Sequence, residues 1–298
     1  MDPARLIVKQ GRTDVQSKGA HMNDSRDTKG RVLVDPEWLE KHLGDPGVRV
    51  VEVDVGPAAY EEGHIQGAVL WNVYSELKDD NYQLATKKSM EHLVGRSGID
   101  QDSTVVFYGY APAMGFWLMR LYEHPDVRIL NTSRSTWRDS GRPWTSEVAA
   151  PVTTRYALRG PDPSVRAQYG DVERSMADPM STILDVRSDL EYRGERFWPS
   201  GMQEAGGRAG HIPSAINLPI DGILDSRGSF RDDDGLRRLF SSIDLEGDGE
   251  MISYCTIGGR ASTAWFALTY LLGRQRVRVY DGSWAEWGRM PQSQVAVA

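Results

Sequence analysis

One stretch of the sequence, YCTIGGRAST, combines the residue types that thiol chemistry needs. It contains Cys255, the only cysteine of the chain. An ordinary thiol is mostly protonated at neutral pH, so a reactive one needs surroundings that stabilise the thiolate. Gly258 and Gly259 permit a turn with inward-pointing amides, and Arg260 adds a permanent charge. A helix predicted to start near Ala261 directs further N–H groups at the loop. The pattern favours a nucleophile beside an anion site over a small buried hydrophobic residue.

The sequence around this stretch repeats an earlier part of the chain. GHIQGAVLWNV in the first half recurs as GHIPSAINLPI in the second. Short apolar runs that end at Asp54 and Asp185 precede the two copies, so we expect these two aspartates to be equivalent. Three further pairs keep nearly the same separation, namely His64 and His211, Tyr108 and Tyr254, and Trp137 and Trp287. Matches that stay in order along the chain indicate a duplication.

The two copies differ at the position that matters for chemistry. The first half has Gly109 where the second half has Cys255. We therefore predict that only the second half does thiol chemistry. The histidines of the GHI motifs occur in both halves, so a structural role in a turn is expected for them rather than catalysis.

Short runs rich in β-branched residues, such as RVVEVDV, STVVFYG and VRILN, alternate with helical patterns in each half. This alternation predicts the α/β class, with two tandem domains that are each a mainly parallel sheet with helices on both faces. We expect a first domain at 31–144, a linker at 145–164 and a second domain at 165–298. Residues 1–30 lack periodicity and read as an N-terminal arm or a cloning-derived tail.

Composition excludes several classes of function. The formal net charge is -7, which argues against nucleic acid or an anionic membrane as the main partner. No run approaches the ~18 apolar residues of a membrane span. The single cysteine cannot form an internal disulfide, and no signal-peptide pattern opens the chain, so a cytoplasmic location is expected. No Cys/His cluster has metal-ligand spacing, and we expect neither a metal nor a cofactor.

Several motifs together resemble the tandem rhodanese family of sulfurtransferases. They are YEEGHIQGA at 60–68, LDVRS at 184–188, GHIPSA at 210–215, CTIGGR at 255–260 and VRVYDGSWAEW at 277–287. The resemblance implies two rhodanese domains, of which the first is silent and the second catalytic. It also implies transfer in two steps, in which Cys255 accepts a sulfane sulfur as a persulfide and then passes it on. Cysteine phosphatases of similar fold use a loop one residue longer, which disfavours phosphatase or arsenate reductase activity.

The resemblance also assigns residues to the substrate. Arg187 is expected to reach an anionic donor, with a surface ion pair to Asp189 or Glu191 as the alternative. The remaining substrate-binding candidates form the loop after the cysteine, namely Thr256, Ile257, Gly258, Gly259 and Arg260.

The donor and the acceptor are open from the sequence. The loop is similar to CRIGER loops, which favours thiosulfate, although Thr256 stands where such loops carry a cation. Mercaptopyruvate is the alternative donor, and cyanide or a thiol the expected acceptor. A further alternative is a persulfide relay or binding module that hands sulfur to a partner protein.

Overall fold

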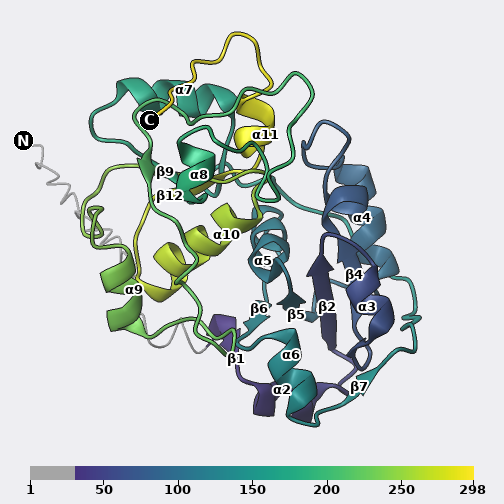
Figure 1. Ribbon diagram of the computed structural model, residues 1–298. Coiled ribbons are helices and arrows are strands. Elements are labelled where there is room, and N and C mark those ends of the chain that lie inside the picture. The colour runs from purple at the N-terminus through teal and green to yellow at the C-terminus, as the bar shows by residue number, and fades with distance from the viewer. Residues whose placement is uncertain (1–30) are drawn as a thin grey trace, which may run out of the picture.

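The computed structural model describes residues 31–298, so the expectation for residues 1–30 lies outside the described part of the chain. Within the described residues each half builds a five-stranded sheet in which all neighbouring strands are parallel (Figure 1). The first sheet has the order β1-β6-β5-β2-β4, from Leu33–Val34, Val127–Leu130, Thr104–Gly109, Val48–Asp54 and Val69–Asn72. The second has the order β10-β9-β11-β12-β8, from Ile216–Asn217, Thr182–Asp185, Met251–Tyr254, Val277–Tyr280 and Arg166–Ala167.

Helices connect the strands of each sheet. Those of the first half are α2 (Pro36–His42), α3 (Ala58–Glu62), α4 (Lys87–Arg96), α5 (Pro112–Leu121) and α6 (Arg134–Asp139), with a π-helical turn η1 (Val73–Leu77). Those of the second half are α7 (Tyr169–Ala177), α8 (Asp189–Tyr192), α9 (Asp233–Leu239), α10 (Gly259–Phe266) and α11 (Ser283–Trp287), with the π-helical turn η2 (Ala267–Leu271) after α10.

Both faces of the sheets are covered, as the sequence predicts. Val105 and Phe107 of β5 belong to the core that includes α4 and α5. Val106 and Tyr108 of the same strand belong to a separate core on the other face, with side chains of α2 and α6. A strand buried on both faces explains why STVVFYG is apolar without alternation.

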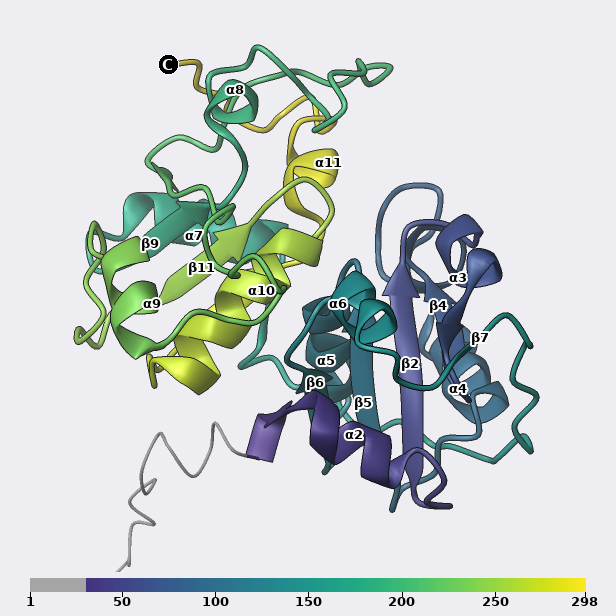
Figure 2. The same cartoon turned by 60° about the horizontal axis from the view of Figure 1, so that its bottom comes forward.

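The two halves share one core. Helices α5 and α10, each of which follows the central strand of its own half, pack against each other between the two sheets (Figure 2). The ring of Phe116 on α5 lies 4.9 Å from that of Phe266 on α10 and 5.1 Å from that of Tyr270 on η2. The packing brings the loops that precede the two helices together, and Ala111 lies beside Gly259.

The chain between the halves is held against the first half. The predicted linker at 145–164 begins inside a short antiparallel pair, β3 (His64–Ile65) with β7 (Trp144–Thr145). The amide of Thr154 then donates to the Gly95 carbonyl at 2.9 Å, and the Trp117 indole donates to the Val165 carbonyl at 2.9 Å. These bonds hold the segment against the first half.

The strand register corrects one predicted equivalence. Tyr254 pairs with Asp185 in the second sheet, whereas its counterpart Tyr108 pairs with Glu52 in the first. Glu52, not Asp54, is therefore the counterpart of Asp185. The expectation was wrong because both carboxylates stand at the end of an apolar run, and the sequence alone does not show which residue the neighbouring tyrosine faces.

Candidate active site

Cys255 directly follows β11 and opens the loop that leads into α10. Its side chain is buried, and the backbone N–H of Gly258 donates to Sγ over 3.1 Å. Gly258 has φ +99°, and a Cβ there would lie 3.1 Å from the Asp281 carbonyl oxygen, so only glycine fits this turn. Helix α10 begins at Gly259, two residues before the predicted start at Ala261. The amide and the helix N-terminus are suited to stabilise negative charge on the sulfur.

A second segment fixes the backbone of this loop. The Cys255 amide donates to the Ser283 hydroxyl at 3.1 Å, and the amide of Trp284 donates to the Cys255 carbonyl at 3.0 Å. The amide of Ala285 donates to the Thr256 carbonyl at 2.9 Å. The motif YDGSW therefore acts as a clamp on the cysteine loop through α11.

Arg260 is paired with an acidic residue beneath the loop. Its guanidinium donates to both carboxylate oxygens of Glu191, at 2.9 and 2.7 Å, and to the Thr256 hydroxyl at 2.8 Å. The Thr256 hydroxyl in turn donates to Glu191 at 2.9 Å. Burial raises the pKa of Glu191, but the bonds and charge of Arg260, with bonds from Ser188 and Thr256, outweigh it and lower the pKa to about 2. The cation of the loop is thus largely balanced by a carboxylate.

A small cavity of about 60 Å³ gives access to the cysteine. Both halves line this inner cavity. The second half contributes Trp198, Pro199, Cys255, Thr256, Ile257, Gly259 and Arg260, and the first contributes Val55, Val73, Tyr74, Tyr110, Ala111 and Met114. Of the predicted loop residues, Gly258 contacts the sulfur through its amide without lining the cavity. The predicted loop residues therefore come together around Sγ.

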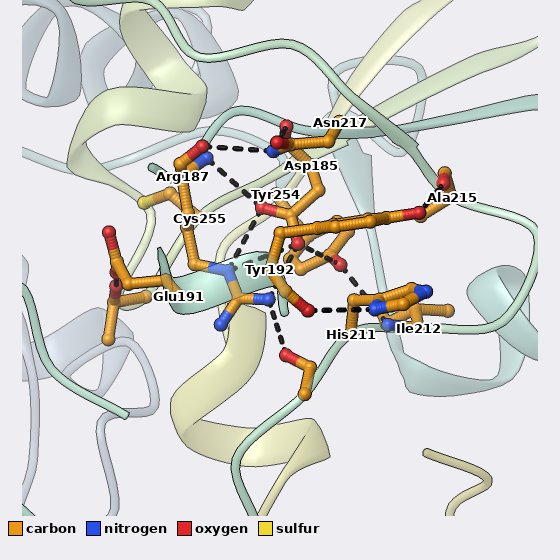
Figure 3. A network of polar contacts seen from close by, with 12 residues as sticks. Asp185, Arg187, Glu191, Tyr192, His211, Ile212, Ala215, Asn217, Tyr254 and Cys255 are labelled. Atoms are coloured by element: carbon orange, nitrogen blue, oxygen red, sulfur yellow. Dashed lines mark hydrogen bonds and ion pairs between the residues drawn. The ribbon is translucent and has the colours of Figure 1, made fainter. Parts of the chain in front are cut away.

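Arg187 lies elsewhere. Its side chain is fully buried and bonds Asp185 through Nε at 2.9 Å and Nη2 at 2.6 Å (Figure 3). It also donates to the Gly210 carbonyl at 2.7 Å and lies over the Trp284 ring at 4.6 Å. The surface ion pair with Asp189 or Glu191 is wrong, because the guanidinium turns inward to Asp185. Arg187 does not line the inner cavity. Its contact with the donor stays a prediction.

The first half contains an arginine with similar contacts, although its side chain is 21% exposed. Arg134 pairs with Glu52 at 3.1 Å and donates to the carbonyl of Gly63, the glycine of the first GHI motif. Arg187 does the same for Asp185 and for Gly210 of the second motif. Because the first half has the same arrangement around Arg134 of α6 but no thiol, these contacts hold the sheet edge in both halves.

The GHI histidines also have matching contacts. His64 stacks on Tyr60 with ring centroids 3.7 Å apart, and its Nδ1 lies 2.8 Å from the Tyr60 carbonyl oxygen. His211 stacks on Tyr192 at 3.7 Å and contacts that carbonyl at 2.8 Å (Figure 3). Neither ring lines the inner cavity, so the predicted structural role is confirmed.

Gly109, the counterpart of Cys255, has a backbone that excludes a side chain. Its φ is +108°, and a Cβ there would lie 2.8 Å from the Val53 carbonyl oxygen and 3.0 Å from the side chain of Glu52. The first half therefore lacks both a thiol and the room for one.

Sequence reasoning missed Lys78, which reaches the clamp from the first half. Its buried ammonium donates to the carbonyl oxygen of Asp281 at 2.8 Å and to its carboxylate at 3.1 Å. Arg166 binds the same carboxylate at 2.7 Å. Burial raises the pKa of Asp281, but the charges of Lys78 and Arg166 prevail and lower it. No periodic signal in the first half points to this contact.

Sequence reasoning also missed Trp198, although a signal for it exists. Tyr60 and His64 stand four residues apart, whereas Tyr192 and His211 stand nineteen apart. The extra residues form a loop in the second half alone, and this loop carries Trp198 into the inner cavity. An insertion confined to one copy of a duplication is a reason to look for function there.

Two absences hold for residues 31–298. No group of three or more His, Cys, Asp or Glu side chains there could hold a metal ion. None of the helices in this range has the length and apolar character needed to cross a membrane.

Comparison with known proteins identifies the family. The family described as Rhodanese-like domain matches residues 35–140 and 169–290. A Haloferax volcanii protein named "Putative thiosulfate sulfurtransferase" is 41% identical over 269 residues, which cover 87% of this chain and 94% of that protein. A Thermus thermophilus protein named "Sulfur carrier protein TtuD" is 38% identical over 268 residues, with 87% and 94% covered.

Solved structures agree on the fold. The structure of EanB matches with a TM-score of 0.80 and 23% identity, covering 90% of this chain and 69% of that chain. An anaerobic ergothioneine biosynthesis enzyme from Chlorobium limicola, solved with trimethyl histidine, matches with a TM-score of 0.79 and 23% identity, with 90% and 70% covered. The predicted fold class and the predicted resemblance are confirmed, and the chain belongs to the rhodanese-like domain family of the sulfurtransferases, with one such domain in each half.

Proposed function

We propose that this chain transfers a sulfane sulfur from thiosulfate to a thiophilic acceptor through a persulfide on Cys255. The observation that carries the proposal is the position of Sγ, which lies 3.1 Å from the Gly258 amide, beside the first turn of α10, and lines a small cavity. A sulfur anion there gains a hydrogen bond and the favourable end of the helix dipole. The names of the Haloferax volcanii and other relatives support thiosulfate as the donor.

The proposed reaction has two balanced steps. The Cys255 thiolate attacks the outer sulfur of thiosulfate, the S–S bond of thiosulfate breaks, and sulfite leaves with the bonding electron pair. The acceptor, cyanide or a thiolate, then attacks the outer sulfur of the persulfide. The new S–S bond breaks, and its electron pair returns to Sγ as the thiolate. No metal, cofactor or external redox agent takes part in either step.

Mass spectrometry of the intact protein tests this proposal. Incubation with thiosulfate is expected to add about 32 Da, and cyanide is expected to remove it. The Cys255→Ser variant is expected to show no added mass because the nucleophile is gone. Absence of the adduct with thiosulfate, with mercaptopyruvate and with an organic persulfide would falsify the proposal.

A persulfide relay is the second candidate, because the Thermus thermophilus relative is named as a sulfur carrier protein. In that case Cys255 holds the sulfur until a partner protein takes it. Slow turnover with cyanide combined with fast transfer to a protein thiol would favour the relay.

Comparison of kcat/KM for thiosulfate and mercaptopyruvate decides between the two donors. The proposed cytoplasmic location is tested by fractionation of the source cells.

A further inference from the structure

The inner cavity adjoins a second, larger one. This outer cavity measures about 390 Å³ and is lined by Val55, Tyr74, Tyr82, Tyr110, Trp198, Pro199, Ser200, Met202, Gln203 and Glu204. Five of these residues, Val55, Tyr74, Tyr110, Trp198 and Pro199, also line the inner cavity. The two cavities are therefore adjacent, and a ligand in the outer one lies next to the space that Cys255 lines.

Aromatic rings dominate the outer cavity. The ring of Tyr82 lies 5.3 Å from that of Trp198 and 6.4 Å from that of Tyr74, both at steep interplanar angles. Tyr110 is 69% exposed and Tyr74 is 43% exposed, although both are large and partly apolar. Exposed aromatic surface in a concavity is typical of a binding site rather than of an ordinary protein surface.

The position of Trp198 is fixed by its neighbours. Its indole donates to Glu204 at 2.9 Å, and the adjacent Phe197 is buried in the core of the second half. The loop therefore presents the Trp198 ring in one orientation. A preorganised ring loses little conformational entropy when a ligand stacks on it.

The charges around the two cavities are balanced. Among the described residues that line them, the charged side chains are Arg260 and Glu204. Arg260 is paired with Glu191 at 2.7 Å, and Glu204 lies 3.8 Å from Arg289. Burial, with the neighbouring hydroxyls of Tyr110 and Tyr82, raises the pKa of Tyr74, so this phenol is a neutral hydrogen-bond donor. A charged ligand body in the outer cavity would find no unpaired countercharge there.

The two cavities differ in size and can hold different parts of the substrates. Thiosulfate and cyanide are small enough for the inner cavity of about 60 Å³ and leave the outer one unused. We propose that the outer cavity binds the body of the sulfur acceptor, and that this acceptor is an organic thiol with an uncharged aromatic body. This inference rests on the proposed function and names the acceptor class for the same site.

The transfer step follows directly. With its ring against Trp198 and Tyr82, the acceptor thiol loses its proton to solvent and attacks the outer sulfur of the Cys255 persulfide. A new S–S bond forms on the acceptor, the S–S bond to Sγ breaks, and the electron pair stays on Sγ. The product is the acceptor persulfide, and no oxidant or reductant is consumed.

The test compares acceptors with the persulfide-loaded enzyme. 2-Phenylethanethiol and 2-mercaptoethanol are both alkyl thiols, and only the first has a ring. We expect kcat/KM to be about tenfold higher for 2-phenylethanethiol, with the difference mainly in KM, because stacking contributes to binding before the reaction. 2-Cyclohexylethanethiol separates a flat ring from general apolarity, and it is expected to fall between the other two.

Substitutions of Tyr82 and Trp198 locate the effect. Tyr82→Ala and Trp198→Ala are expected to reduce the preference for 2-phenylethanethiol to less than threefold, and Trp198→Phe is expected to keep most of it. Met180→Ala is the matched control, because Met180 is an exposed apolar residue that does not line either cavity. Tyr82 lines the outer cavity alone, so this variant remains informative if Trp198→Ala fails to fold.

Three results would overturn the inference. They are equal kcat/KM for 2-phenylethanethiol and 2-mercaptoethanol, equal kcat/KM for the phenyl and cyclohexyl thiols, and an unchanged preference in both alanine variants. Each variant is first incubated with thiosulfate, and the mass of the intact protein is measured. A missing adduct in the wild type contradicts the proposed function instead, so the two failures are distinguishable.

Discussion

Glu191 changes the role expected of Arg260. The sequence places a permanent cation at the end of the cysteine loop, which suggests a direct effect on the thiolate. The carboxylate that balances this cation comes from α8, far along the chain, and spacing within the loop could not reveal it. The structure leaves the Gly258 amide, 3.1 Å from Sγ, as the direct contact to the sulfur. Residue types in the loop could thus be predicted to surround the thiol, whereas their charge balance could not.

The ion pair predicts how stability depends on pH. The pKa of Glu191 lies near 2 in the folded protein and near 4.5 when unperturbed. A carboxyl with a lowered folded pKa stabilises the fold above its unfolded pKa and loses that contribution as pH falls toward its folded pKa. Between pH 4.5 and 2 we expect Glu191 to account for on the order of 3 kcal/mol of lost stability. Urea unfolding at several pH values measures this loss.

The variant Glu191→Gln lacks the titrating group, so its stability is expected to fall less over the same pH range. Glu195→Gln serves as the control, because Glu195 is an exposed acid on the loop that follows α8. If the stability of Glu191→Gln falls as steeply with acid as that of the wild type and of Glu195→Gln, the assignment of the low pKa to this carboxyl is incorrect.

At the scale of elements, the strands could be read from the sequence, whereas some side-chain directions could not. Runs such as STVVFYG and VRILN become β5 and β6, and the loop after β11 carries the thiol. The surface ion pair expected for Arg187 was wrong because residues two apart near a strand share a face, which turns the guanidinium toward Asp185. That rule was available in the sequence. The direction of the loop with Trp198 was not, because it depends on packing between the halves.

The backbone at Gly109 leaves no room for a side chain at the position that corresponds to Cys255. Gly109→Ala is expected to cost more stability than Gly67→Ala, although both glycines have positive φ, +108° and +80°. Strain at such a φ costs roughly 1–3 kcal/mol at either site. At Gly109 the contact with the Val53 carbonyl adds to it, whereas nothing lies within 4 Å of the added Cβ at Gly67.

Thermal or urea unfolding compares the two variants directly. Gly109→Cys is expected to be destabilised in the same way and to show no second sulfur adduct after thiosulfate treatment. Equal losses for the two alanine variants, or a second adduct in Gly109→Cys, would show that the backbone is not what keeps the first half inactive.

At the scale of the whole molecule, the half without a thiol completes the site of the other half. It supplies Tyr74 and Tyr110 to the inner cavity and sends Lys78 into the clamp around Asp281. The duplication predicted the two domains, but a contact between distant segments depends on how α5 and α10 pack. A single amino-acid sequence contains no periodic pattern that predicts such a contact.

Lys78→Met is expected to show how strongly the halves depend on each other. Removal of one partner from a buried ion pair typically costs about 3–5 kcal/mol, because the other charge stays buried. Arg166 still contacts Asp281, so we expect the lower end of that range. We also expect slower formation of the persulfide from thiosulfate, because the Asp281 backbone packs against Gly258. Urea unfolding and time-resolved mass spectrometry measure the two effects.

Lys87→Met is the control, since Lys87 is an exposed lysine at the start of α4. If Lys78→Met and the control lose the same small amount of stability and load sulfur at the same rate, the contact between the halves does not position the loop.

The single buried thiol also determines how the protein responds to peroxide. A sulfenic acid on Cys255 finds no second thiol in its own chain, so it cannot be trapped as an internal disulfide. Peroxide is small enough to enter the narrow inner cavity and reach Sγ. Recovery therefore depends on a reducing thiol from outside the chain. The passage that admits a sulfur acceptor is then also the passage for repair.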